Sequence, residues 1–75
     1  MAWDRCESNM FKQNLGSNIK RRRIEMNLNI EGLAILTNSS KSYIWNVDNG
    51  LIDPSISKMI KIAKALETDV QTLIS

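Results

Sequence analysis

The chain has 75 residues, a formal net charge of +2 and no histidine. This length fits one small domain with one modest core. The lack of His and the single cysteine, Cys6, exclude zinc fingers, internal disulfides and catalysis built on histidine. No apolar run approaches the about 20 residues of a membrane span, and the first ten residues do not resemble a signal peptide.

Residues 1–9 have no hydrophobic period, and we interpret residues 1–10 as an N-terminal arm, disordered or loosely docked, before a domain at residues 11–75. Trp3 and Cys6 are the two residues of this arm that would pack on the domain or on a partner.

Residues 11–26 are predicted to form the first helix, because apolar residues recur every four positions and again seven positions later: Phe11, Leu15, Ile19 and Met26. Gly16 costs about 1 kcal/mol relative to Ala inside a helix, so its presence favours close packing at that point.

Four cations follow one another in this helix, at residues 20–23. Consecutive helical residues are rotated by about 100°. The four side chains therefore cannot share one face, and some of them must point inward or toward a partner.

Residues 29–50 are predicted to form two short helices joined by a tight turn at residues 37–39. Asn29 and Ser40 are suitable N-caps, and Asn38 occupies a position where the backbone needs a positive φ. Ile44 and Val47 define the inner face of the second helix, which ends at Gly50. Its outer face contains hydrogen-bonding side chains suited to the edges of base pairs in a major groove: Lys41, Ser42, Tyr43, Trp45, Asn46 and Asn49.

Two more helices are predicted after Pro54, which bars helix at Asp53. The first covers residues 56–66, with an apolar face formed by Ile56, Met59, Ile60, Ala63 and Leu66 and widened by Ile62. Its lysines recur every three residues and are interpreted as a solvated face: Lys58, Lys61 and Lys64. A last short helix, capped by Thr68 or Asp69, contains the apolar residues Val70, Leu73 and Ile74, which complete the core, meet a second copy, or do both.

From Leu15 to Ile74 the chain resembles the Cro/CI-type helix-turn-helix family, also called the XRE family. The residues that carry the resemblance are Gly16, Ile19, Arg23, Leu28, Leu33, Ala34, Ile44, Asp48, Gly50, Pro54, Ser55 and the run at residues 62–66. The resemblance implies an all-α, five-helix, lambda-repressor-like DNA-binding domain. It also implies a homodimer that binds two-fold operators, in a bacterial or phage-encoded protein that is cytoplasmic and nucleoid-associated when bound. The segment at residues 41–44 is most similar to restriction–modification controllers.

The resemblance also implies roles for individual residues. Base contacts fall on Lys41, Ser42 and Asn46, with Trp45 on the exposed flank, and phosphate contacts fall on Ser40, Tyr43 and Asn49. We also predict that Arg21 and Arg22 contact phosphates. The dimer interface is predicted to consist of Val70, Leu73 and Ile74. Trp45 has a second interpretation, in which its ring folds back over Leu36 or Tyr43.

The chain departs from the family pattern at several positions. Ile30 replaces a Gln that binds a phosphate, Arg22 replaces a Leu, and Glu67 replaces a Gly after the fourth helix. The family pairs Arg23 with an acid at position 48; Asp is shorter than the usual Glu, so a longer or less direct pair is expected. These departures predict a marginal monomer that dimerisation stabilises.

The predicted function is a sequence-specific regulator of transcription that binds double-stranded DNA, as a restriction–modification controller or phage-type repressor. Two alternatives stay open: an antitoxin-type regulator that also binds a protein toxin, and a protein-interaction module that has lost DNA binding. A polymerase subunit is a further protein partner to consider. No enzyme, metal, cofactor or membrane partner is expected, because the acids are scattered and a chain this short has little room for a pocket.

Overall fold

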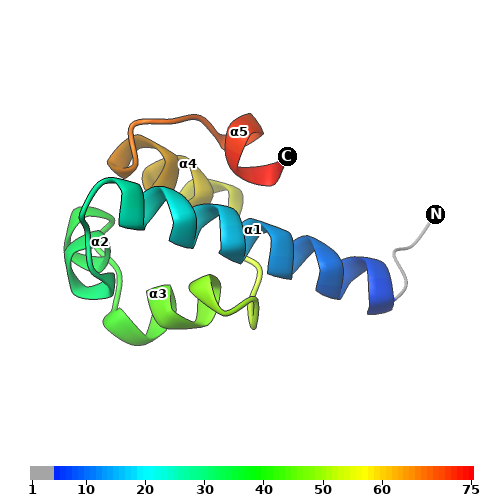
Figure 1. Ribbon diagram of the computed structural model, residues 1–75. Helices are drawn as coiled ribbons and strands as arrows, with labels where there is room; N and C mark the ends of the chain where they lie inside the picture. The colour runs from blue at the N-terminus through cyan, green and yellow to red at the C-terminus, as the bar shows by residue number, and fades with distance from the viewer. Residues whose placement is uncertain (1–4) are drawn as a thin grey trace.

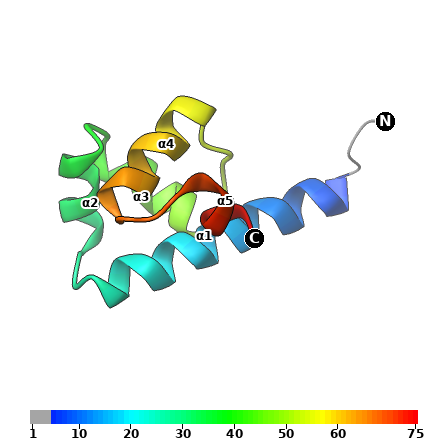
Figure 2. The same cartoon turned by 90° about the horizontal axis from the view of Figure 1, so that it is seen from above.

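The computed structural model describes residues 5–75 of the chain, with side chains from residue 10 onward. This part of the chain consists of α1 (Arg5–Glu25), α2 (Ile30–Leu36), α3 (Lys41–Asp48), α4 (Ile56–Ala65) and α5 (Val70–Ile74). In Figure 1, α1 runs across the molecule, with α2 and α3 on one side of it and α5 on the other. The N-terminal part of α1 extends beyond the other helices in both Figure 1 and Figure 2.

The core lies where the C-terminal part of α1 meets the other helices. Its buried hydrophobic residues come from all five helices and the end of α4: Leu15, Ile19, Leu33, Ala34, Ile44, Val47, Ile62, Ala63, Leu66 and Leu73. Phe11 and Met26 pack against this cluster from α1 and its C-terminal end. The apolar period predicted for the first helix is therefore confirmed.

α1 begins at Arg5, six residues before the predicted start at residue 11. Extending a helix that is already formed costs far less than starting one. Residues 5–10 therefore continue α1 without an apolar period of their own. Trp3 and the side chain of Cys6 lie outside the described part, so the prediction about their packing stays a prediction.

The predicted capping residues occupy the cap positions. The side chains of Asn29, Ser40, Ser55 and Asp69 accept hydrogen bonds from backbone N–H groups at the starts of α2, α3, α4 and α5. Asn38 has a φ of 54°, as predicted for the turn after α2, and Glu67 has a φ of 55° after α4.

The buried face of α4 differs from the predicted one. Ile62, Ala63 and Leu66 are buried, whereas Ile56 is 62% exposed and Ile60 is 42% exposed. Ile56 and Ile60 are one turn apart on the flank of the helix, so the apolar face is wider than the surface that the other helices cover. Leu36, at the end of α2, is also exposed.

α1 and α3 make a close backbone contact at Gly16. A Cβ atom at this position would lie 2.5 Å from the Val47 carbonyl oxygen and 2.7 Å from that of Asp48. Both oxygens belong to the backbone of α3 and cannot move aside as a side chain does. Gly16 therefore permits the close packing that the sequence suggested at this position, and the structure identifies α3 as the partner.

None of the helices in residues 5–75 has the length and apolar character needed to cross a membrane.

Candidate functional site

The turn between α2 and α3 is closed by short hydrogen bonds. The Thr37 hydroxyl donates to the Leu33 carbonyl oxygen at 2.8 Å, and the Ser39 backbone N–H donates to the Ala34 carbonyl oxygen at 2.8 Å. Asn38 lies between them with its positive φ. Thr37 is 1% exposed, and its buried hydroxyl is satisfied locally by this hydrogen bond.

α3 presents four of the predicted contact residues on its outward side. Lys41 and Ser42 are exposed, Trp45 is 50% exposed, and Asn46 is half-buried. Within residues 10–75, the side chains of Lys41, Ser42 and Asn46 form no hydrogen bond or ion pair. Their donors and acceptors are therefore available to a ligand that approaches α3.

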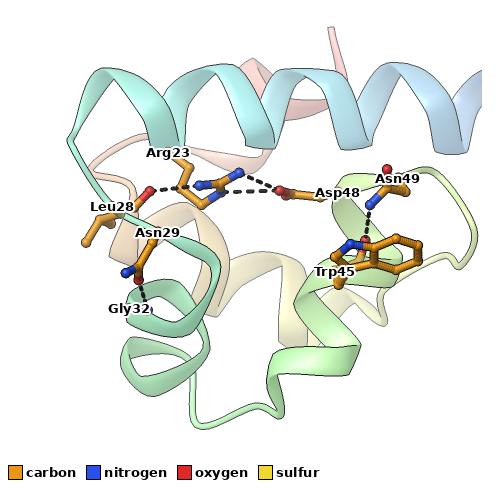
Figure 3. Close-up of polar contacts among 7 residues, drawn as sticks. All are labelled: Arg23, Leu28, Asn29, Gly32, Trp45, Asp48 and Asn49. Atoms are coloured by element: carbon orange, nitrogen blue, oxygen red, sulfur yellow. Dashed lines mark hydrogen bonds and ion pairs between the residues drawn. The ribbon is translucent and has the colours of Figure 1, made fainter.

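Three of the five residues assigned to phosphates lie on α3 or at its two ends, and they have partial partners within the protein. The Ser40 side-chain oxygen accepts a hydrogen bond from the Tyr43 backbone N–H at 3.0 Å. Asn49 donates its side-chain amide to the Trp45 carbonyl oxygen at 2.8 Å, as Figure 3 shows. Tyr43 is half-buried, and this burial raises the pKa of its phenol, while a backbone hydrogen bond from Ser55 acts in the opposite direction. A Ser hydroxyl and an Asn amide each retain a further donor after these bonds.

Arg23 and Asp48 join α1 to the end of α3 (Figure 3). The Arg23 Nε and Nη2 atoms lie 3.2 Å and 2.8 Å from Asp48 Oδ2, and Arg23 Nη1 donates to the Leu28 carbonyl oxygen at 2.8 Å. Both residues are buried. The expectation that the shorter Asp would lengthen the pair is wrong, because the close approach of α1 and α3 brings the two groups into direct contact.

Ile30 lines a hollow of about 330 Å³ near the starts of α2 and α3. The hollow is lined by Arg23, Asn29, Ile30, Glu31 and Lys41. Ile30 packs partly against the core, so the side chain that replaces the family's Gln adds apolar contact and offers no donor here.

Arg21 and Arg22 lie on the α5 side of α1, beside Thr68 and Thr72. Arg22 Nε donates to the Leu66 carbonyl oxygen at 2.9 Å, and its Nη1 lies 3.5 Å from Glu25 Oε1. The exposed arginine Arg21 contacts Asn18 at 3.4 Å. The structure therefore does not bring these two arginines together with Lys41 at the outward side of α3.

The three residues assigned to a dimer interface have different environments. Leu73 is 2% exposed and belongs to the core, Val70 packs partly against it, and Ile74 is 42% exposed. α5 is attached to α1 by a hydrogen bond from Asn18 Nδ2 to the Leu73 carbonyl oxygen, 2.8 Å long. Of the three, only Ile74 offers a large exposed apolar surface.

Sequence reasoning missed Lys58, which was assigned to a solvated face. Its ammonium group lies 2.8 Å from Ser39 Oγ, 3.3 Å from the Asn38 carbonyl oxygen and 5.6 Å from the Tyr43 ring centroid. A spacing of three residues falls about 60° short of a full helical turn. Lys58 therefore points in a different direction from Lys64 and lies on the inward side of α4 with Ile62. The helical period was the signal in the sequence that could have separated Lys58 from the solvated face.

Comparison with known proteins gives consistent matches. The model of the helix-turn-helix family HTH_3 matches residues 19–73. The restriction-modification controller protein C.AhdI from Aeromonas hydrophila is 27% identical with a TM-score of 0.80, and the match covers 83% of this chain and 94% of that chain. An HTH_3 family transcriptional regulator from Vibrio cholerae is 29% identical with a TM-score of 0.81, covering 88% of this chain and 37% of that one.

The clp gene regulator ClgR from Corynebacterium glutamicum, 19% identical with a TM-score of 0.81, shares the fold over 84% of this chain and 67% of that one. No curated protein matches the sequence. These comparisons confirm the all-α helix-turn-helix fold that the sequence predicted.

Proposed function

The chain belongs to the HTH_3 helix-turn-helix family of DNA-binding regulators, and we propose that it acts as a homodimer on a two-fold operator. In this proposal one α3 per half-site enters the major groove, in segments about 34 Å apart. The protein would serve as a small controller of the restriction–modification kind or as a phage-type repressor.

The outward side of α3 is the observation that supports this proposal most directly. Lys41, Ser42 and Asn46 are held on one short helix by its N-cap and its buried inner face, yet their side-chain polar atoms have no partner within residues 10–75. Lys41 is assigned to guanine O6 and N7, and Asn46 to adenine, in line with the usual pairings of these side chains with base edges. Trp45 is assigned to a thymine methyl group or sugar next to them.

Phosphate contacts are assigned mainly to neutral donors. Among residues 30–49 Lys41 is the only cation, and Arg23 is buried against Asp48. Ser40, Tyr43 and Asn49 would therefore contribute phosphate contacts that position α3 without counterion release. Arg21 and Arg22 are left out of this surface because they lie beside α5. A shallow dependence of affinity on salt concentration follows.

The dimer surface is assigned to the side of α5 that exposes Ile74. Leu73 supports this surface from within the core and does not face a partner. Ile74→Asp should weaken self-association in analytical ultracentrifugation and reduce affinity for a two-fold site. Ile60→Asp is a matched control, because Ile60 on α4 is also 42% exposed. Equal effects of the two variants would contradict this assignment.

The test of the proposed function is selection of bound molecules from random-sequence duplex DNA at near-physiological salt. We expect a two-fold motif with half-site centres about 10 base pairs apart. Lys41→Ala should cost about 1–3 kcal/mol at one base pair and remove the preference there. Lys61→Ala, which removes an exposed lysine from α4, serves as the control.

A uniform loss across all sequences in Lys41→Ala would instead make Lys41 a phosphate contact. Weak binding without any enriched motif would contradict the proposed function and favour the antitoxin or interaction-module alternatives. Trp45 would then be the residue to examine in a protein contact, because half of its surface is exposed.

A further inference from the structure

Lys58 connects α4 to the helix-turn-helix turn. It lies in the first turn of α4, half-buried, on the side that faces the other helices. Its Nζ atom is 3.4 Å from the Thr37 carbonyl oxygen, 3.3 Å from the Asn38 carbonyl oxygen and 2.8 Å from Ser39 Oγ. Lys61 and Lys64, on the same helix, are exposed and form no ion pair or hydrogen bond within residues 10–75.

The number of these contacts matches the chemistry of the group. An ammonium has three N–H donors and no acceptor, and three oxygens of the turn are in range of it. The carbonyl groups of Thr37 and Asn38 follow the last residue of α2, where helical carbonyls lack intrahelical partners and favour a nearby cation. Lys58 therefore caps the end of α2 from another helix and has no donor left over for an outside group.

Lys58 also contacts the recognition helix itself. Its ammonium lies 5.6 Å from the centre of the Tyr43 ring, within the range of a cation–π interaction. Tyr43 is preceded by Ser42 and Lys41 at the start of α3, where base contacts are assigned. One side chain thus touches the turn before α3 and the first turn of α3.

We infer that Lys58 is a positioning residue that fixes the turn at residues 37–39 and the start of α3, and thereby the selectivity of Lys41 and Ser42 for DNA sequence. The part of this inference that concerns DNA rests on the proposed function. Lys58 acts through Ser39 and Tyr43 and does not contact the DNA.

The experiment compares Lys58→Met, which keeps an unbranched side chain of similar length, with Lys61→Met as the matched control. Affinities are measured for the selected operator and for an unrelated duplex of equal length, over a series of salt concentrations. We expect Lys58→Met to lower the ratio of operator to unrelated affinity about tenfold, the factor that a hydrogen bond to a charged group can supply. The salt slope should not change, and Lys61→Met should leave the ratio intact.

Two results would overturn the inference in this assay. An equal loss for both duplexes with a salt slope lower by about 1 would identify Lys58 as a phosphate contact. An unchanged ratio with reduced resistance to urea would make Lys58 a purely stabilising residue.

A second variant, Ser39→Ala, removes the nearest acceptor and leaves the lysine in place. If Lys58 acts through the turn, Ser39→Ala should lower the ratio in the parent protein and have little further effect in Lys58→Met. Additive losses would contradict the inferred route.

Hydrogen exchange on the free protein tests the inference apart from any DNA. Lys58→Met should accelerate exchange of the Ser39 amide, whose bond to Ala34 closes the turn, relative to that of Ile62 in the core. If the parent protein enriches no motif, the proposed function fails, and this measurement alone decides whether Lys58 fixes the turn. Unchanged exchange at Ser39 would overturn the inference.

Discussion

The ion pair between Arg23 and Asp48 gives the most decisive test of the packing that holds α3. Arg23→Met keeps most of the apolar stem of the side chain and removes its charge. Asp48, which is 6% exposed, would then be left as a buried carboxylate without its cation. Its Oδ1 atom has no hydrogen-bond partner among the described atoms, and both arginine bonds converge on Oδ2. The Leu28 carbonyl oxygen would lose its donor as well.

The expected loss can be set against the stability of a chain of this size. Removing one member of a buried ion pair costs about 3–5 kcal/mol. A domain of 75 residues has a free energy of unfolding of about 4–11 kcal/mol at typical values per residue. Arg23→Met should therefore remove a large share of the free energy of unfolding, and the midpoint of urea unfolding should fall by more than about 1 M.

The double variant Arg23→Met with Asp48→Leu separates the pair's own contribution from the cost of an unpaired charge. Replacing both members by apolar residues of similar volume is commonly neutral or stabilising. The double variant should therefore be more stable than Arg23→Met alone when both are followed by circular dichroism in urea. Arg21→Met, at an exposed arginine of the same helix, is the control and should change stability little.

A loss below about 1 kcal/mol in Arg23→Met would refute this reasoning, because it would mean that the Asp48 carboxylate finds water or another partner. If the double variant were no more stable than Arg23→Met, the arginine would stabilise the fold by packing alone. A further readout is operator affinity per folded molecule, which should fall in Arg23→Met because Asp48 is the last residue of α3, the helix proposed to enter the major groove.

Three other changes test separate features. Gly16→Ala should destabilise the protein by about 1–3 kcal/mol in urea unfolding, because the new Cβ would meet the Val47 carbonyl oxygen at 2.5 Å; unchanged or increased stability would contradict the close α1–α3 contact. Glu67→Gly should raise stability by up to about 1 kcal/mol, because Glu67 has a φ of 55°; a lower midpoint of thermal unfolding would count against strain there. Hydrogen bonds from the Thr72 side chain and backbone hold the pKa of Asp69 below its ordinary value. A lowered folded-state pKa stabilises the fold above the ordinary value, and this contribution is lost as the pH falls through the folded-state pKa. Asp69→Asn should therefore make thermal unfolding less sensitive to pH in the acidic range below the ordinary pKa of Asp, and an unchanged sensitivity would exclude Asp69 as a contributor.

Local chemistry made much of the helix-turn-helix predictable. Asn29, Ser40 and Ser55 cap helices because their side-chain oxygens accept bonds from backbone groups a few residues away. Asn38 adopts a positive φ because Asn tolerates this conformation better than most other non-glycine residues. These properties depend on neighbours in the sequence and need no knowledge of the tertiary structure.

The set of side chains on the outward side of α3 was likewise predictable, since they lie away from the buried residues Ile44 and Val47. The sequence pattern did not predict how much of each side chain is exposed to solvent. In the structure Lys41 and Ser42 are exposed, Asn46 is half-buried, and half of the surface of Trp45 is exposed. The exposure of each side chain depends on the packing of α3 against α1 and α2, which no local sequence pattern specifies.

The sequence by itself therefore determined where α2, α3, α4 and α5 start, which turn separates α2 from α3, and which residue types α3 presents. Only the tertiary structure decided the roles of side chains that act across helices. Lys58 caps the end of α2, Arg22 binds the Leu66 carbonyl, and Leu73 fills the core where a dimer contact was expected. The physical reason is distance along the chain. Caps and turns bring together atoms a few residues apart, whereas these contacts join residues 20 and 44 positions apart for Lys58 and Arg22, and they exist only once the helices have packed.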